Sequence, residues 1–353
     1  MKRIFAICLA AVTAFGLCAC SSGDSDDQPP GANVVRIYNW GEYIDEDVIG
    51  EFEEETGIKV IYDTFSTNEE MYPRIEADPS LYDVICPSEY MVEKMKNNGL
   101  LQEIDHDRLE NYGNLGQVYL DILDEYIDPG NKYMVPYCWG TVGILYNTTL
   151  VDEEITSWTS LWDPKYSGSI LMQDSVRDAF MVAEKILGYS ANTKDEAELE
   201  ECRKLLKEQY PLVKAYVIDE VRDKMIAGYT ALGVIYSGEY LYCSEENEDL
   251  AYCIPEEGSN IWYDGWVITK NARNVDAAYK WIDYMLRGDI AARNFDYITY
   301  STPNEAALEY IDEEILEDPG VFPDEETIAK QEMYMYLGEE TEDLYYEMWK
   351  RVK

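Results

Sequence analysis

The chain has 353 residues, of which 71 are Asp or Glu and 28 are Lys or Arg, so its formal charge is −43. A chain this acidic repels polyanions, which argues against nucleic acid and anionic membrane surfaces as partners and favours cationic ones. Hydrophobic residues make up 46% of the chain, enough for a folded core, and the length predicts two lobes or domains. Because His106 is the only histidine, multi-histidine metal sites are excluded, and we expect neither a metal nor a cofactor.

The amino terminus has the pattern of an export signal. A short basic start and an apolar stretch at 4–17 precede LCAC, which resembles a bacterial lipobox. We expect residues 1–19 to be a signal peptide, Cys20 to be lipidated and residues 20–33 to form a tether. The alternative is an ordinary secretory signal that is cut elsewhere. No later apolar run approaches the roughly 18 residues needed to span a bilayer, so we expect a protein anchored outside the membrane by acyl chains.

From residue 34 onward, short β-rich segments alternate with amphipathic helical ones. The pattern predicts strands at 34–39, 58–63 and 83–87 and helices at 45–56, 68–77 and 89–98. Connections this short, with right-handed crossovers, predict a mostly parallel sheet that helices cover on both faces.

The second half repeats this style with other lengths. It predicts strands at 169–173, at 232–237 and from 265 onward, and helices at 176–187, 196–208 and 276–286. We expect two α/β lobes, one formed by 34–138 with 263–308 and the other by 143–258 with 313–353. The chain would cross between them near 136–140 and 258–264. The five cysteines after Cys20 fit no zinc or redox spacing; we expect free, mostly buried thiols, with a Cys243–Cys253 bond left open.

The ends of the predicted strands are rich in aromatic and acidic side chains. Ligands of open α/β sheets bind beyond the carboxyl ends of the strands, so these positions are candidates for a binding site. They include Trp40, Glu42, Tyr43, Ser88, Glu89, Tyr90, Asp174, Ser175, Asp178, Tyr236, Glu239, Trp262 and Asp264. None of these positions is a lysine, so an anionic ligand would have no obvious partner except Arg177. Asp174 and Ser175 are equally plausible as caps of the helix that begins at 176.

This mixture of residue types has a chemical meaning. Aromatic faces attract ammonium groups by about 0.5 to 2 kcal/mol each. A carboxylate supplies a charge-assisted hydrogen bond of about 1.5 to 3 kcal/mol, and flat rings cover methylenes at about 0.8 kcal/mol per CH₂. A flexible diamine or triamine would use all three contributions.

Longer stretches carry a specific resemblance. They are IYNWGEYIDEDVIGEFEEETGIKVIYDTF, YDVICPSEYMVEKM, MVPYCWGTVGILYN, SWTSLWDPKYSG, LGVIYSGE, IWYDGWVIT with AAYKWIDYMLR, and YSTPNEAA. Over residues 34–353 the chain resembles the substrate-binding component of bacterial spermidine/putrescine ABC importers. The resemblance implies a two-lobe periplasmic-binding-protein fold of type II-like form, with a hinge and a cleft that closes on a polyamine. It also implies a membrane permease and an ATPase as partners, no catalysis, and an extracytoplasmic location.

The same resemblance assigns roles to individual residues. It implies that Trp40 and Tyr43 line the cleft with Glu42 between them, that Ser88 and Tyr90 follow the third strand, that Asp178 is the acid of the second-lobe helix, and that Trp262 stands beside Asp264, the main ammonium partner. Four positions depart from a spermidine-preferring pattern. Ser175 replaces an acid, Tyr236 a tryptophan and Tyr334 a glutamine, whereas Glu239 matches putrescine-preferring relatives. These departures favour a shorter ligand or dual use.

Three alternatives stay open. The same scaffold would accept a quaternary amine, which needs aromatic rings but fewer acids, or a ferric ion, which needs clustered tyrosines. The third hypothesis is an enzyme rather than a binding protein: a secreted glycosidase with a carboxylate pair such as Glu42 and Asp264. We expect a monomer.

Overall fold

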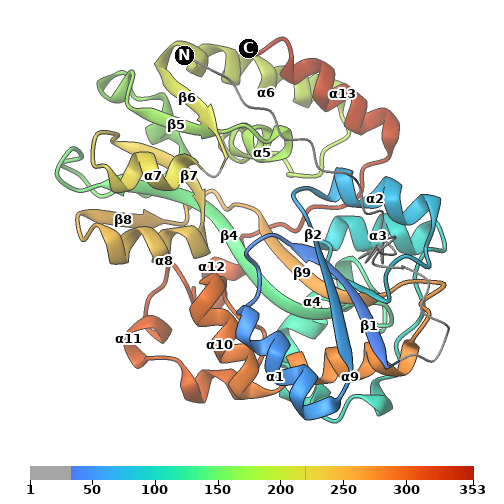
Figure 1. Cartoon of the computed structure of the whole chain (residues 1–353). Coiled ribbons are helices and arrows are strands. Elements are labelled where there is room, and N and C mark those ends of the chain that lie inside the picture. Colours follow the sequence, from blue (N-terminus) through green and yellow to red (C-terminus); the bar gives the residue numbers. More distant parts are fainter. Residues whose placement is uncertain (1–32, 219) are drawn as a thin grey trace, which may run out of the picture.

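One hydrogen-bonded sheet runs through the computed structural model, which describes residues 33–218 and 220–353 (Figure 1). Its strands are β1 (Val34–Trp40), β2 (Lys59–Phe65), β3 (Val84–Ile85), β4 (Val135–Asn147), β5 (Ile170–Gln173), β6 (Val213–Val217), β7 (Leu232–Tyr236), β8 (Leu250–Cys253) and β9 (Ile261–Ile268). Their order is β2-β1-β3-β9-β4-β7-β5-β6, with β8 also paired to β4.

The sheet contains two groups of parallel strands, β2-β1-β3 and β7-β5-β6. The antiparallel pair β9 and β4 joins them. β4 pairs with β9 over 135–141 and with β7 over 142–146, so this one strand belongs to both parts of the sheet. The predicted mixed, mostly parallel α/β architecture is therefore confirmed, whereas the exact lobe boundaries stay a prediction.

Helices cover both faces of each parallel group. They are α1 (Glu46–Thr56), α2 (Asn68–Ala77), α3 (Glu89–Asn97), α4 (Gln117–Tyr126), α5 (Val176–Leu187), α6 (Glu196–Gln209), α7 (Glu220–Ile226), α8 (Ser237–Glu246), α9 (Val275–Met285), α10 (Gly288–Ile298), α11 (Glu313–Leu316), α12 (Glu325–Ile328) and α13 (Glu339–Trp349). Around β1 and β3, one core includes side chains of α1 and α9 and a second core includes those of α2, α3 and α4. Around β5 and β7, α5, α6 and α13 lie on one side and α7 and α8 on the other.

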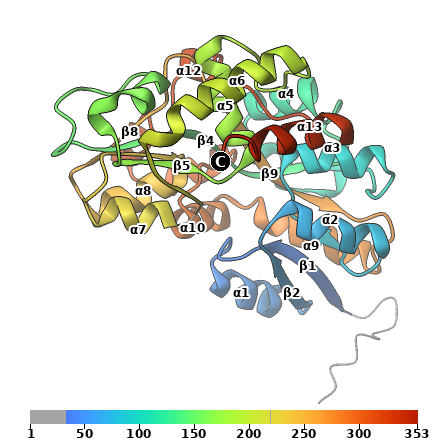
Figure 2. The ribbon, with the colours of Figure 1, turned by 90° about the horizontal axis from the view of Figure 1, so that it is seen from above.

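The two views agree on the arrangement of the ends. The elements β5, β6, α5 and α6 lie at one end of the molecule and β1, β2 and α1 at the other, while α13 lies beside α3 (Figures 1 and 2). The backbone N–H of Tyr336, just before α13, donates to Oε2 of Glu93 on α3 at 3.0 Å. The carboxyl-terminal segment thus contacts the first parallel group as well as the second.

Helix ends follow the expected capping chemistry. Ser175 caps α5, since its hydroxyl accepts from the N–H of Asp178 at 3.4 Å, and α5 ends at Gly188 with a φ of 75°. Asp174, the other capping candidate, instead forms an ion pair with Lys353. The capping interpretation is thus confirmed for Ser175 and wrong for Asp174.

The structure also tests two further expectations, on the start of β9 and on the cysteines. β9 begins at Ile261 rather than at 265, so Trp262 and Asp264 lie within the strand, because pairing with β4 orders a segment whose polar residues resemble a loop. The five cysteines of the described residues are free, which confirms the expected thiols; Cys243 and Cys253 are not bonded. Cys20 and the predicted signal peptide lie outside the described residues. Within those residues no helix has both the length and the apolar character of a membrane span.

Candidate functional site

A row of five aromatic rings lies where the carboxyl ends of β1 and β7 approach β9. The ring centroids are 6.3 Å apart for Trp40 and Tyr43, 5.8 Å for Tyr43 and Tyr300, 4.8 Å for Tyr300 and Trp262, and 6.2 Å for Trp262 and Tyr236. Most of these pairs meet edge to face or tilted, the geometry that aromatic quadrupoles favour. The row therefore connects the first parallel group to the second.

Glycines make room for two rings of this row. A Cβ on Gly238 would lie 2.2 Å from the Tyr300 ring, and one on Gly140 would lie 2.7 Å from the Trp262 ring. Contacts that short do not occur between real atoms, so both positions require glycine. The backbone of β4 and α8 thus fixes where the two rings stand.

Asp264 of β9 is a buried carboxylate on one side of the row, with 4% of its surface exposed. Its Oδ2 accepts a hydrogen bond from the Tyr43 hydroxyl at 2.7 Å, and Oδ1 is fully buried without a donor in hydrogen-bonding geometry. Burial raises the pKa of Asp264 to about 6, and the neighbouring hydroxyls of Ser88 and Tyr43 partly offset this rise. This oxygen has no hydrogen-bond partner among the described residues, so it can receive a donor from a ligand.

Asp178 is a second buried carboxylate, in the first turn of α5, with 3% exposure. Its Oδ2 accepts from the Tyr236 hydroxyl at 2.8 Å and its Oδ1 from the Tyr334 hydroxyl at 2.9 Å. The guanidinium of Arg177 lies 4.4 Å from the centre of the Tyr334 ring. Burial, and then the charge of Asp178, raise the pKa of both phenols well above the ordinary value, so both stay protonated donors.

Ser88 and Tyr90 stand at the start of α3 and are tied to α2. The side-chain amide of Asn68 donates to the Ser88 hydroxyl at 3.1 Å and to the Tyr90 hydroxyl at 3.0 Å, and the Tyr90 hydroxyl donates to Glu69 at 3.1 Å. A backbone bridge between Ser88 and Asp264 places this group against β9. The segment after β3 is thus held beside the buried carboxylate.

The remaining two candidates are placed differently. Glu42 is exposed on a turn with a φ of 52°, whereas Asp264 is buried, and this difference does not support a catalytic carboxylate pair. Glu239 lies in the first turn of α8, and its side chain is 11% exposed and 3.9 Å from Arg222. Its charge raises the pKa of Tyr300, so it lies near the row without belonging to it.

Three residues of the cluster had no role assigned from the sequence, although Glu89 is among the strand-end positions. Tyr300 completes the aromatic row, Cys138 contacts the Tyr43 hydroxyl at 3.0 Å through its sulfur, and Glu89 is 1% exposed beside Tyr263. Tyr300 follows a helix rather than a strand, so the strand-end criterion misses it. The YSTPNEAA stretch is the signal that contains it.

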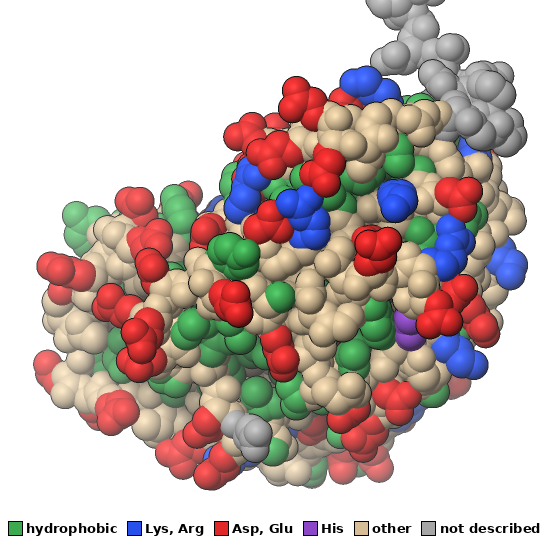
Figure 3. Space-filling view, turned by 90° about the horizontal axis from the view of Figure 1, so that it is seen from below, with side chains coloured by type: hydrophobic (Ala, Val, Ile, Leu, Met, Phe, Trp, Pro, Cys, Tyr) green, Lys and Arg blue, Asp and Glu red, His purple; other side chains and the backbone are tan. Residues whose placement is uncertain are grey.

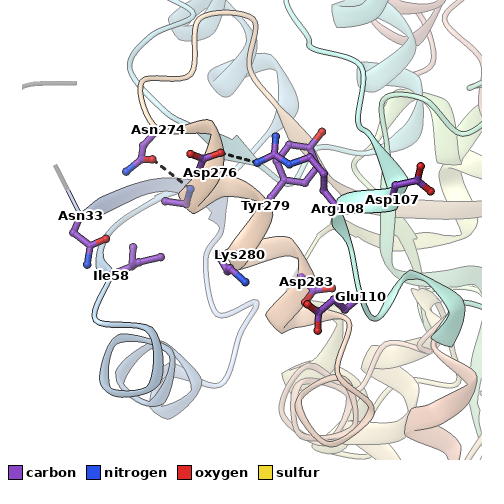
Figure 4. A pocket seen from close by; sticks show the side chains of 11 residues that line it. Asn33, Ile58, Asp107, Arg108, Glu110, Asn274, Asp276, Tyr279, Lys280 and Asp283 are labelled. Atoms are coloured by element: carbon purple, nitrogen blue, oxygen red, sulfur yellow. Dashed lines mark hydrogen bonds and ion pairs between the residues drawn. The ribbon is translucent and has the colours of Figure 1, made fainter. Parts of the chain in front are cut away.

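A separate pocket of about 620 Å³ lies between the start of β1 and α9 (Figure 4). There Arg108 pairs with Asp276 at 2.7 Å and stacks over the Tyr279 ring at 3.6 Å. None of its lining residues belongs to the aromatic and acidic cluster. Figure 3 shows the acidic side chains spread over the face seen from below rather than gathered into one patch, as expected of a solvated surface.

The cluster is suited to holding a cation without covalent chemistry. It combines aromatic faces, buried carboxylates and phenol oxygens. Among residues 33–218 and 220–353, no three His, Cys, Asp or Glu side chains gather in a way that could hold a metal ion. An organic cation therefore fits this donor set better than a metal.

Comparison with known proteins agrees in sequence and in fold. Residues 47–323 match the family described as bacterial extracellular solute-binding protein. The spermidine/putrescine-binding periplasmic protein of Salmonella typhimurium is 36% identical over 346 residues, which cover 98% of this chain and 96% of that protein. The putrescine-binding periplasmic protein of Pseudomonas aeruginosa is 30% identical, with coverages of 100% and 99%.

Solved structures extend the comparison. The spermidine/putrescine ABC transporter substrate-binding protein of Streptococcus pneumoniae matches with a TM-score of 0.83 and 42% identity, covering 90% of this chain and 98% of that one. A lipoprotein of Treponema pallidum matches with a TM-score of 0.79 and 25% identity, covering 91% and 99%. The fold class expected from the resemblance is confirmed.

Proposed function

Because the chain belongs to the family of bacterial extracellular solute-binding proteins, we propose that it captures polyamines, putrescine or spermidine or both, and delivers them to an ABC permease. The relatives from Salmonella and Streptococcus bear names that specify spermidine and putrescine, and the one from Pseudomonas a name that specifies putrescine. The expected resemblance to this group of proteins is confirmed.

The observation that carries the proposal is the pair of buried carboxylates at the aromatic row. A polyamine has an ammonium group at each end and methylenes between. One ammonium would bind the free oxygen of Asp264, and the other would bind near Asp178 and its two phenols. The row formed by Trp40, Tyr43, Tyr300, Trp262 and Tyr236 would cover the methylenes, at about 0.8 kcal/mol per CH₂.

The details of the Asp178 side favour a short ligand. Both of its carboxylate oxygens already accept a phenol, so an ammonium there meets phenol oxygens polarised by the carboxylate rather than the carboxylate itself. Ser175 has a neutral side chain, and its hydroxyl is already engaged as the cap of α5. The Glu239 carboxylate already forms an ion pair with the Arg222 guanidinium, at 3.9 Å. We therefore propose putrescine as the preferred ligand, with Ser88 and Tyr90 closing the Asp264 side.

Ligand capture would involve closure of two lobes, 34–138 with 263–308 and 143–258 with 313–353. In support of this, β4 and β9 are the strands that join the two parallel groups, so a hinge would pass through them. Contacts such as that of Glu93 with the N–H of Tyr336 would then form on closure.

We propose that the mature protein begins at Cys20 and is held at the outer face of the membrane by acyl chains on that residue. The pattern of residues 1–20 supports this, as does the similarity to a lipoprotein of Treponema pallidum. A permease and an ATPase would be its partners in transport. The proposed role is non-covalent binding by a monomer.

The test is calorimetric titration of residues 20–353 with putrescine, spermidine, cadaverine and choline. We expect micromolar or tighter binding of putrescine, weaker binding of spermidine, and little response to choline, whose quaternary nitrogen donates no hydrogen bond to Asp264. Failure of every polyamine to bind would refute the proposal, and tighter choline binding would favour a quaternary amine.

A further inference from the structure

Glu89, the first residue of α3, is a buried acid with one unused oxygen. Its side chain belongs to a residue that is 1% exposed. Oε2 accepts the backbone N–H of Tyr263 at 3.0 Å, and Oε1 is fully buried with no hydrogen-bond partner. A neutral amide would satisfy the Tyr263 N–H equally well, so the hydrogen bond alone does not explain why an acid stands here.

Glu89 lies in the immediate surroundings of Asp264. The backbone bridge between Ser88 and Asp264 sets the two acids on adjacent segments, and Tyr263 is the neighbour of Asp264 along β9. The charge of Asp264 raises the pKa of Glu89. Two buried carboxyl groups thus lie on adjacent backbone segments, and each has an oxygen with no hydrogen-bond donor among the described residues.

The groups that act on Glu89 come from three elements. From β9 these are Asp264 and the Tyr263 phenol, from α5 Arg177, and from its own helix the Tyr90 phenol. Burial is the largest influence and raises the pKa of Glu89 to about 8; the backbone N–H of Tyr263 and the Arg177 charge act in the opposite direction. Near neutral pH the carboxyl is thus mostly protonated, which avoids two adjacent buried charges.

We propose that Glu89 is a second carboxyl group of the Asp264 pocket, which holds a proton in the empty protein and releases it to solvent when a cationic ligand binds beside Asp264. An ammonium within a few ångströms favours the ionised form of both acids, so ligand binding and proton release become linked. The bound ligand then has a second carboxylate beside it, whereas in the empty protein Glu89 stays neutral. This inference rests on the proposed function.

The test is calorimetry of putrescine binding near pH 7 in buffers of different ionisation enthalpy, such as phosphate and Tris. The dependence of the heat on the buffer gives the number of protons released. With a pKa of about 8 for Glu89, we expect release of up to about 0.9 proton per ligand. Asp264, with a pKa of about 6, is already mostly ionised at this pH and contributes little.

Glu89→Gln should abolish this release and weaken binding by about tenfold, since one ligand carboxylate is lost. Glu110→Gln, at an exposed acid of the separate pocket, is the matched control and should release as many protons as the wild type. Putrescine binding without proton release by the wild type, or unchanged release by Glu89→Gln, would overturn the inference alone. If Glu89→Gln does not fold, the wild type alone tests the inference. Its proton release on binding must vanish well above pH 8, where Glu89 is already ionised in the empty protein. Absence of all polyamine binding would overturn the proposed function and the inference with it.

Discussion

The two buried carboxylates of the site differ in how far the protein satisfies them. Asp178 has a phenol donor for each oxygen, whereas Asp264 has one phenol and one oxygen without a donor. A satisfied buried carboxylate stabilises the fold, and an unsatisfied one costs stability but is ready for a ligand. Two acids that are similarly buried are therefore expected to have opposite effects on the free energy of unfolding.

Replacing Asp264 is expected to have the largest effect on binding. Asp264→Asn removes the charge-assisted bond to an ammonium, worth about 2 to 3 kcal/mol, so polyamine affinity should fall by roughly 30- to 150-fold. The raised pKa of Asp264 means that ionisation destabilises the folded state as pH rises through about 4 to 6. Thermal melts above pH 6 should therefore show the variant to be at least as stable as the wild type. Asp276→Asn, in the separate pocket, is the control and should leave affinity unchanged.

Asp178→Asn should lower the free energy of unfolding, whereas Asp264→Asn should not. An asparagine puts an NH₂ group in place of one of the two oxygens, so either Tyr236 or Tyr334 loses its acceptor, and we expect a loss of about 1 to 3 kcal/mol. Affinity should fall by about tenfold, less than for Asp264→Asn, because phenols stand between this acid and the ligand. Paired calorimetric and chemical-denaturation measurements would decide; equal effects of both variants would contradict the comparison.

Acidification should sharpen the distinction between the two acids. Below pH 6 Asp264 takes up a proton, so affinity should fall by up to about tenfold per pH unit in addition to any change at higher pH. Asp264→Asn should lack this additional fall, whereas Asp178→Asn should retain it. Titrations between pH 5 and 7 would show whether one acid accounts for the loss.

The smallest expected effect concerns the ring between the two acids. Gly238→Ala places a Cβ against the Tyr300 ring and should displace it, lowering stability by about 1 to 3 kcal/mol and affinity severalfold. Gly41→Ala, where a Cβ meets nothing within 4 Å, should change neither. Equal polyamine affinities of the two variants would show that Tyr300 is not part of the proposed site.

Much of this architecture was predictable because local signals agree with the fold. The bounds of α5 follow from the Ser175 cap and Gly188, and the alternation of strand and helix gives the two parallel groups. The start of β9 was not predictable, because its order comes from β4, far away in sequence.

The site was predictable only where it follows the strand ends. Trp40, Ser88 and Tyr236 do so, whereas Tyr300 enters from a segment after α10. Glu89 also follows a strand end, but its role was not predictable, because an acid in the first turn of a helix is the ordinary complement of the helix dipole and only its burial marks it as unusual.

The aromatic row also gives the protein an optical signal. Trp139, Trp158, Trp266 and Trp281 are fully buried in cores, where their surroundings stay constant. Trp40 and Trp262 stand in the row, each with a buried indole N–H that has no hydrogen-bond partner in the described residues. A cation arriving between them would change their emission, so the intensity of the protein's own fluorescence should report occupancy without any label, and Trp262→Phe should remove much of that response.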